Sequence, residues 1–302
     1  MKRLVITVAS ILACCTLSMQ AGATVNVLAC EPEWAALAQA VGGDKVKVTS
    51  ATTPLQDPHR IEARPSLIAR ARNADLLVCS GLELEVGWLS ILLQQSANAK
   101  IAPGQPGYFE AGPLLPRIEL PARVDRSEGD VHPGGNPHVH LDPRNVARLA
   151  PLLATRLGDI DPANKAYYQA TAADFSARWA AAMARWEQRA AVLKGVGVIV
   201  HHKNMTHLLN WLGMRELGAL EPKPGIEPSA AHLSSLLSQL QSQPAKMVLR
   251  AAYQDSRASE WIAERAKMSA VMLPYTVGGT DRAKDLFALF DDTLDRLLGA
   301  LK

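Results

Sequence analysis

The sequence predicts an α/β protein of two lobes, each a parallel β-sheet flanked by helices, joined by one long rigid helix. Two observations lead to this fold class. Short apolar, strand-like runs alternate with helical stretches in the first part of the chain and again in the last part, which is typical of parallel sheets with helices on both faces. Between these parts, residues 161–194 carry a helical pattern that no glycine interrupts.

Residues 1–23 have the pattern of a secretory signal peptide. A short basic region precedes an almost wholly apolar run at residues 4–13, and the small residues 21–23 resemble a cleavage site. The apolar run is too short to span a bilayer comfortably. We therefore expect an exported chain that starts at Thr24. Lipidation at Cys14, which would anchor the chain, is the alternative interpretation of this segment.

Composition excludes partners that bind through charge. Loss of Lys2 and Arg3 with the signal peptide lowers the formal net charge by two, from +3 to +1. A nearly neutral chain has no electrostatic attraction to nucleic acid or to an anionic membrane. The roughly 280 remaining residues are enough for two lobes of ordinary size.

The first lobe is expected at residues 24–160. Its predicted strands are 25–30, 45–51 and 75–80, and its predicted helices are 31–41, 65–73 and 84–96. Pro65 stands in the first turn of its helix, where a proline is well tolerated. A Pro- and Gly-rich stretch follows at 102–137, and a loop of this length indicates a functional or mobile segment.

The linking helix is expected at residues 161–194 and the second lobe at 195–302. Asp161 provides a capping carboxylate and Pro162 a first-turn proline. Trp179 and Trp186 recur at helical spacing, so we interpret them as packing residues. The second lobe has predicted strands at 196–200, 247–251 and 271–275, and predicted helices at 205–212, 228–243, 256–266 and 285–301.

Two cysteines remain after removal of the signal peptide, and an exported chain meets an oxidising compartment. Cys30 and Cys79 each follow an apolar strand-like run. If these strands are neighbours in one parallel sheet, their ends are adjacent and a disulfide can form. The sequence is equally consistent with two buried free thiols at these positions.

Three histidines are the candidate metal ligands: His59, His138 and His202. Each lies where an apolar strand or a Pro/Gly loop ends, and they are far apart in sequence. Only a folded chain could bring them together. Neutral imidazole is a favoured ligand of zinc and its neighbours in the transition series, so convergence of these residues predicts a transition-metal site.

Five motifs follow one another along the chain beyond residue 23: Asp57-Pro58-His59 with Arg64-Pro65-Ser66; Asn73-Ala74-Asp75-Leu76-Leu77-Val78; Gly81-Leu82-Glu83-Leu84-Glu85 with Trp88; Asn136-Pro137-His138 with Leu141-Asp142-Pro143; and His202 eleven residues before Gly213. In this order they resemble the solute-binding proteins of zinc and manganese ABC importers. Each motif alone is a weak indication of this family, but the occurrence of all five in the same order is specific for it. The resemblance covers essentially the whole exported chain.

The resemblance implies a periplasmic receptor that captures Zn²⁺ as transported ligand and delivers it to an inner-membrane ABC permease. The family's metal ligands fall on His59 and His138 in the first lobe and on His202 in the second. A third imidazole favours zinc, whereas a carboxylate there favours manganese. Relatives carry a late carboxylate as fourth ligand, but residues 275–279 contain no acid. Asp281 or water remain the candidates for this position.

Other positions depart from the family pattern. Many zinc-binding relatives have a long His- and Asp-rich loop before the second ligand, but this chain offers only Asp125, Glu128, Asp130 and His132 there. Metal capture by the segment is therefore expected to be slight, or to need a metal-delivering partner. His140 stands where an aromatic residue is common and could enter an altered site.

Three further histidines are not expected to bind metal, and two other functions are possible for the predicted site. His201 is expected to point away from its neighbour, and His207 and His232 to be surface or packing residues of helices. A Mn²⁺ or Fe²⁺ receptor of the same type is one alternative function. A zinc hydrolase is another, because three histidines and a water also form a catalytic zinc site. The chain has neither HExxH nor Gly-x-Ser-x-Gly, so we predict that it is not an enzyme.

Overall fold

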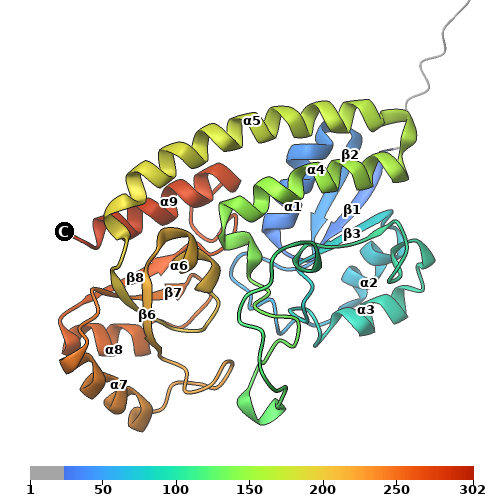
Figure 1. The fold of residues 1–302 in the computed structure, drawn as a ribbon. Coiled ribbons are helices and arrows are strands. Elements are labelled where there is room, and N and C mark those ends of the chain that lie inside the picture. Colours follow the sequence, from blue (N-terminus) through green and yellow to red (C-terminus); the bar gives the residue numbers. More distant parts are fainter. Residues whose placement is uncertain (1–23) are drawn as a thin grey trace, which may run out of the picture.

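The computed structural model describes residues 24–302, which form two α/β lobes beneath a pair of long helices (Figure 1). The predicted signal peptide and Cys14 lie outside the described residues. The first lobe contains a parallel sheet with strand order β2-β1-β3-β4. Its strands are β1 (Val25–Ala29), β2 (Val46–Ser50), β3 (Leu76–Cys79) and β4 (Tyr108–Glu110). Its helices are α1 (Pro32–Gly42), α2 (Pro65–Arg72) and α3 (Leu89–Ser96).

The second lobe repeats this arrangement with the strand order β6-β5-β7-β8, again all parallel. Its strands are β5 (Gly197–Val200), β6 (Arg215–Ala219), β7 (Met247–Ala251) and β8 (Ser269–Leu273). Its helices are α6 (Thr206–Leu212), α7 (Ala230–Ser242), α8 (Arg257–Ala266) and α9 (Leu286–Gly299). The predicted fold class is therefore confirmed: two helix-flanked parallel sheets.

A helical hairpin joins the lobes (Figure 1). Helix α4 (Pro143–Ile160) turns into α5 (Lys165–Ala190), with short 3₁₀ turns at Pro162–Asn164 and Ala191–Leu193. The predicted long helix is thus confirmed, and a 3₁₀ turn replaces the α-helical conformation at each of its ends. Among residues 24–302, no helix is both long and apolar enough to span a membrane.

One continuous apolar core runs through both lobes. It includes the inner faces of both sheets and the buried sides of α1, α4, α5 and α9. Trp179 and Trp186 on α5 are 0% and 1% exposed and contact Phe287 and Phe290 on α9. Their predicted packing role is confirmed. Smaller apolar clusters fill the outer faces, between the first sheet and α2/α3 and between the second sheet and α7/α8.

Two edge strands and one helix were not predicted from the sequence. Strand β4 is only three residues long and lies inside the Pro/Gly-rich stretch. Strand β6 has the sequence Arg-Glu-Leu-Gly-Ala, which lacks the β-branched and aromatic residues typical of strands. Helix α4 contains Pro151, which removes one backbone hydrogen bond, yet its apolar face, from Val146 to Leu157, is buried along the whole helix.

Two predicted elements are displaced. The helix expected at 84–96 begins only at Leu89, because Gly81, Leu82 and Glu83 all have positive φ angles of 71°, 55° and 66° and form a left-handed turn instead. The strand expected at 271–275 ends at Leu273. Tyr275 has a φ of 66°, a conformation incompatible with a strand, and its side chain turns toward the site.

Candidate metal centre

His59 lies in the loop that follows β2. The Asp57 carboxylate accepts a hydrogen bond from the His59 backbone N–H at 3.0 Å and lies 2.7 Å from His59 Nδ1. The indole N–H of Trp88 donates to the Pro58 carbonyl at 2.8 Å, so a buried side chain of the first lobe fixes this loop. The sequence therefore forms a rigid turn that presents one imidazole.

His138 lies at the end of residues 116–137, which we name the loop segment. Its backbone N–H donates to the Asn136 side chain at 3.0 Å, and Asn136 in turn donates to the Lys203 carbonyl in the second lobe at 2.8 Å. The His138 side chain is buried, with 1% exposure. Its Nδ1 lies 2.8 Å from the hydroxyl of Tyr275, so Asn136 fixes the backbone of His138 and Tyr275 of the second lobe holds its imidazole.

His202 follows the central strand β5 at the carboxyl end of the second sheet. Ligand sites of parallel sheets commonly form at this edge, where the strand ends meet. The Nδ1 atom of His202 lies 2.6 Å from the Glu221 carboxylate. His201, its neighbour, has its Nε2 3.9 Å from the same Glu221 and lines one cavity with His59 and His202. The expectation that it points away from His202 is wrong, because β5 ends at Val200 and strand alternation does not extend to these residues.

The three predicted ligands converge. The ring centroid of His59 lies 5.3 Å from that of His138 and 5.5 Å from that of His202, and the last two are 5.9 Å apart. In each case a carboxylate or phenol occupies the Nδ1 side, which leaves Nε2 to face the common centre. Such partners fix the tautomer and orientation of metal-binding imidazoles.

A fourth imidazole, His132, joins this group. Its ring centroid lies 5.4 Å from that of His59 and 6.1 Å from that of His138, and nitrogen atoms of these three residues lie within 4.8 Å of one another. The sequence predicts only slight metal capture by the segment that contains His132, because a single histidine in a long loop carries no spacing pattern. Its position six residues before His138 was the only available signal.

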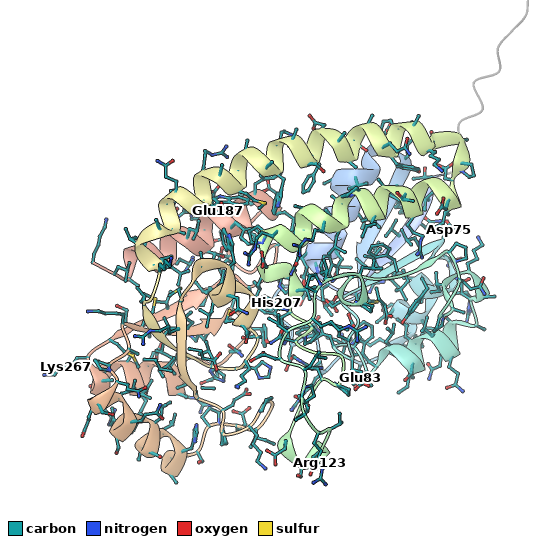
Figure 2. All side chains as sticks on the ribbon, viewed as in Figure 1. Asp75, Glu83, Arg123, Glu187, His207 and Lys267 are labelled. Carbon is teal, nitrogen blue, oxygen red and sulfur yellow. A yellow bond between two sulfur atoms is a disulfide. The ribbon has the colours of Figure 1, made fainter. Side chains whose placement is uncertain are left out.

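The other candidates lie elsewhere. Asp281 is exposed and belongs to none of the metal-capable groups found among residues 24–302. His207 is buried and its Nε2 lies 3.1 Å from the Asn136 carbonyl, at the junction of the lobes in Figure 2. His232 on α7 contacts the Ala219 carbonyl at 2.9 Å. These are packing roles, as expected for His207 and His232.

Burial and charge repulsion favour the neutral form of two of these imidazoles, His138 and His132. Burial, with the nearby His59 and His202, lowers the pKa of His138 well below its ordinary value. The same causes lower the pKa of His132 to about 3. Burial would raise the pKa of Asp57, but its hydrogen bond to His59 and the charge of that imidazole outweigh burial and lower it. Neutral nitrogens beside ionised carboxylates are the state that binds a cation.

His140 belongs to a buried polar network beside the site. Its Nδ1 lies 3.1 Å from a Glu33 carboxylate oxygen, and its Nε2 lies 3.0 Å from the Tyr275 carbonyl. Thr276 of the second lobe donates to Glu33 of the first. His140 therefore supports the backbone of Tyr275, whose hydroxyl contacts His138, and both of its ring nitrogens already face protein groups.

The disulfide considered from the sequence is present between Cys30 and Cys79, with 4.8 Å between the Cα atoms. It joins the ends of β1 and β3, which are neighbouring strands. Free thiols at these positions are therefore excluded. Because both sulfurs are bonded to each other, they are not available as metal ligands.

Fold and site together define a two-lobed α/β protein with imidazoles of both lobes gathered in one place, an arrangement suited to a transition-metal ion. The sequence profile of the family described as zinc-uptake complex component A, periplasmic (ZnuA), matches residues 27–300. The chain belongs to this family, and the resemblance noted from the sequence is confirmed.

Individual relatives support the same class of protein. The chain is 27% identical over 197 residues to the high-affinity zinc uptake system protein ZnuA of Yersinia pestis, covering 61% of each chain. It is 29% identical over 151 residues to the manganese ABC transporter substrate-binding lipoprotein PsaA of Streptococcus mitis, covering 49% of this chain and 46% of PsaA. The matched regions thus span roughly half to three fifths of the length of these curated relatives.

A solved structure described as the crystal structure of ZnuA shares the fold, with a TM-score of 0.77 and 22% sequence identity over 92% of this chain and 100% of that one. The family consists of substrate-binding components of metal uptake systems, not of enzymes. The zinc hydrolase alternative is thereby set aside.

Proposed function

We propose that this protein is a periplasmic receptor that captures Zn²⁺ between its two lobes and delivers it to an inner-membrane ABC permease. The observation that carries this proposal is the convergence of His59, His138 and His202, with each Nδ1 engaged by another side chain. The family description and the transporter relatives support the delivery step. The loop segment contains one histidine, which favours an additional metal-delivering partner.

Zinc is preferred over manganese or iron because the donor set is rich in imidazole. The nearest carboxylates, Asp57 and Glu221, contact imidazole Nδ1 atoms at 2.7 and 2.6 Å, so the nitrogens face the centre. Nitrogen donors suit zinc, whereas manganese prefers oxygen. A Mn²⁺ or Fe²⁺ receptor is the second candidate, because relatives such as PsaA are named for manganese.

The first experiment is a titration of the metal-stripped protein with Zn²⁺, Mn²⁺ and Cu²⁺. We expect one tightly bound zinc and much weaker binding of manganese. Copper should compete well, because its intrinsic affinity for nitrogen sites exceeds that of zinc, so zinc against manganese is the decisive comparison. Tighter binding of manganese than of zinc would contradict the proposal.

The ligand assignment is tested by single variants. His59→Ala, His138→Ala and His202→Ala should each weaken zinc binding by orders of magnitude, because each removes one of three ligands. His232→Ala is the matched control, since its ring contacts the Ala219 carbonyl in the second lobe. His207 is unsuitable, because it contacts Asn136 beside His138. Stoichiometric, tight zinc binding by His202→Ala would rule out the third ligand.

A further inference from the structure

We propose that His132 is the fourth metal ligand and that it completes an all-imidazole site with His59, His138 and His202. This inference rests on the proposed function, because it adds a donor to the same site. It also gives the loop segment a task, which is to carry a ligand to an ion that the two lobes hold from the other sides.

The geometry of the imidazoles supports a tetrahedral set. Zinc–nitrogen bonds are about 2.0–2.1 Å long, so tetrahedral donors lie roughly 3.4 Å apart. Nitrogen atoms of His59, His132 and His138 already lie within 4.8 Å of one another. His202 approaches from the second lobe, with its ring 5.5 Å from that of His59. Small side-chain movements would bring four nitrogens around one ion.

Two ring nitrogens lack a partner at this position. The Nε2 atoms of His59 and His132 are buried without a hydrogen bond. Burial of an unpaired polar atom is costly in free energy, and buried polar groups without partners are rare in folded proteins. Both atoms belong to rings whose centroids are 5.4 Å apart. A shared metal ion would satisfy both nitrogens.

The opposite side of the His132 ring is held by backbone. The backbone of Leu82 and Glu83 raises the pKa of the His132 ring against the effect of burial, and because Nε2 is unpaired, Nδ1 is the nitrogen that faces this backbone. These two residues follow Gly81 in the left-handed turn of the first lobe. Non-glycine residues rarely adopt positive φ, and such conformations collect at functional sites. The turn therefore fixes the tautomer with Nε2 free to bind metal.

The loop segment that carries His132 contacts both lobes. Asp130 donates its backbone N–H to the Pro224 carbonyl at 2.9 Å, and Lys223 donates to the Ser127 carbonyl at 2.9 Å. The Asp130 carboxylate also lies 3.9 Å from Arg60, next to His59. In Figure 1 this green segment runs between the lobes. His132 is thus supported from both lobes.

The test compares His132→Ala with Arg123→Ala. Arg123 lies in the same segment, with an 85% exposed side chain, and at its tip in Figure 2. Zinc affinity is measured by competition with a chromogenic chelator, and coordination by the visible absorption of the Co²⁺-loaded protein. Circular dichroism and melting of the metal-free variants check folding.

We expect His132→Ala to bind zinc at least about tenfold more weakly than the parent, since even outer partners of ligands contribute roughly 10–100-fold. Its Co²⁺ spectrum should shift as oxygen replaces nitrogen, and Arg123→Ala should match the parent. Parent-like affinity and spectrum in His132→Ala would overturn the inference. If His202→Ala still binds zinc much more weakly than the parent, the proposed function stands. Weaker zinc binding with an unchanged Co²⁺ spectrum, or an equal loss in Arg123→Ala, would also overturn the inference. Parent-like zinc binding by His59→Ala, His138→Ala and His202→Ala would contradict the proposed function itself.

Discussion

Glu31 and Glu85 bring two carboxyl groups together in the first lobe, and both side chains are 2% exposed. Glu85 accepts hydrogen bonds from the backbone N–H groups of Ser80 and Gly81 at 2.7 and 3.1 Å, and so anchors the left-handed turn behind His132. Burial, followed by the charge of Glu85, raises the pKa of Glu31 well above its usual value. Burial also raises the pKa of Glu85 to about 7. The pair therefore retains a proton near neutral pH.

This retained proton predicts a pH-dependent stability. Between the unfolded carboxyl value of about 4.5 and the folded value of about 7, the native state binds more protons than the unfolded state. The free energy of unfolding therefore falls as pH rises through this window. In Glu85→Gln, whose amide oxygen still accepts hydrogen bonds, this contribution is lost. We expect the variant to gain stability relative to the parent from pH 5 to pH 8.

Urea unfolding of metal-free protein at several pH values measures the difference between parent and variant. Taking the difference cancels the histidine contributions, which act in the opposite direction because burial lowers the pKa values of His138 and His207. Parallel pH profiles for the two proteins would contradict the prediction.

At the scale of elements, the sequence predicts the long helix α5, the shorter helices of both lobes and the central strands, but not α4, which contains Pro151. The central strands are buried runs such as Leu76–Cys79 and Gly197–Val200, whose patterns depend on local residues. The edge strands β4 and β6 were missed because pairing with a neighbour, not composition, makes them strands. His132 was missed for a related reason: its position depends on contacts with Leu82 and Glu83, distant in sequence.

The disulfide between β1 and β3 leads to a prediction about stability. It connects residues 49 positions apart, so it restricts a long loop of the unfolded chain. A disulfide of this kind contributes roughly 2–4 kcal/mol. The double variant Cys30→Ala/Cys79→Ala should lose about this much unfolding free energy in urea denaturation. Zinc stoichiometry should be retained, because the disulfide contacts none of the four site imidazoles.

Reduction of the parent protein is the matched comparison, since it breaks the same bond without removing side-chain atoms. Equal stability of oxidised and reduced parent would show that the bond constrains little. Loss of zinc binding in a variant that remains folded would instead link the disulfide to the site.

At the scale of the whole molecule, the lobes share structure instead of meeting at a flexible linker. Helix α5 packs on α4 and α1 of the first lobe and on α9 of the second. Trp179 donates its indole N–H to the Pro143 carbonyl on α4, and Trp186 donates to Asp291 on α9, each at 2.8 Å. A large hinge rotation would have to break this common core.

We therefore predict that zinc orders the loops of the site with little movement of the lobes. Binding to the native state alone stabilises it by about 4 kcal/mol when free zinc is a thousandfold above its dissociation constant. This corresponds to a rise in melting temperature on the order of 10 °C. The radius from small-angle scattering should change little. A compaction of several ångströms on adding zinc would show that the helix bends and would exclude this mechanism.

Three of the four proposed ligands, His59, His138 and His202, are contributed by distant stretches of chain, and this has a consequence for the biosynthesis of the protein. An unfolded polypeptide offers isolated imidazoles, and bringing such remote positions together carries the entropic cost of closing large loops. A newly exported, unfolded chain should thus hold no chelated ion, and loading should follow the completion of both lobes. The amount of bound metal would then measure the number of correctly folded molecules. A variant that folds poorly would show the same loss of metal as a variant that lacks a ligand, unless its folding is measured separately.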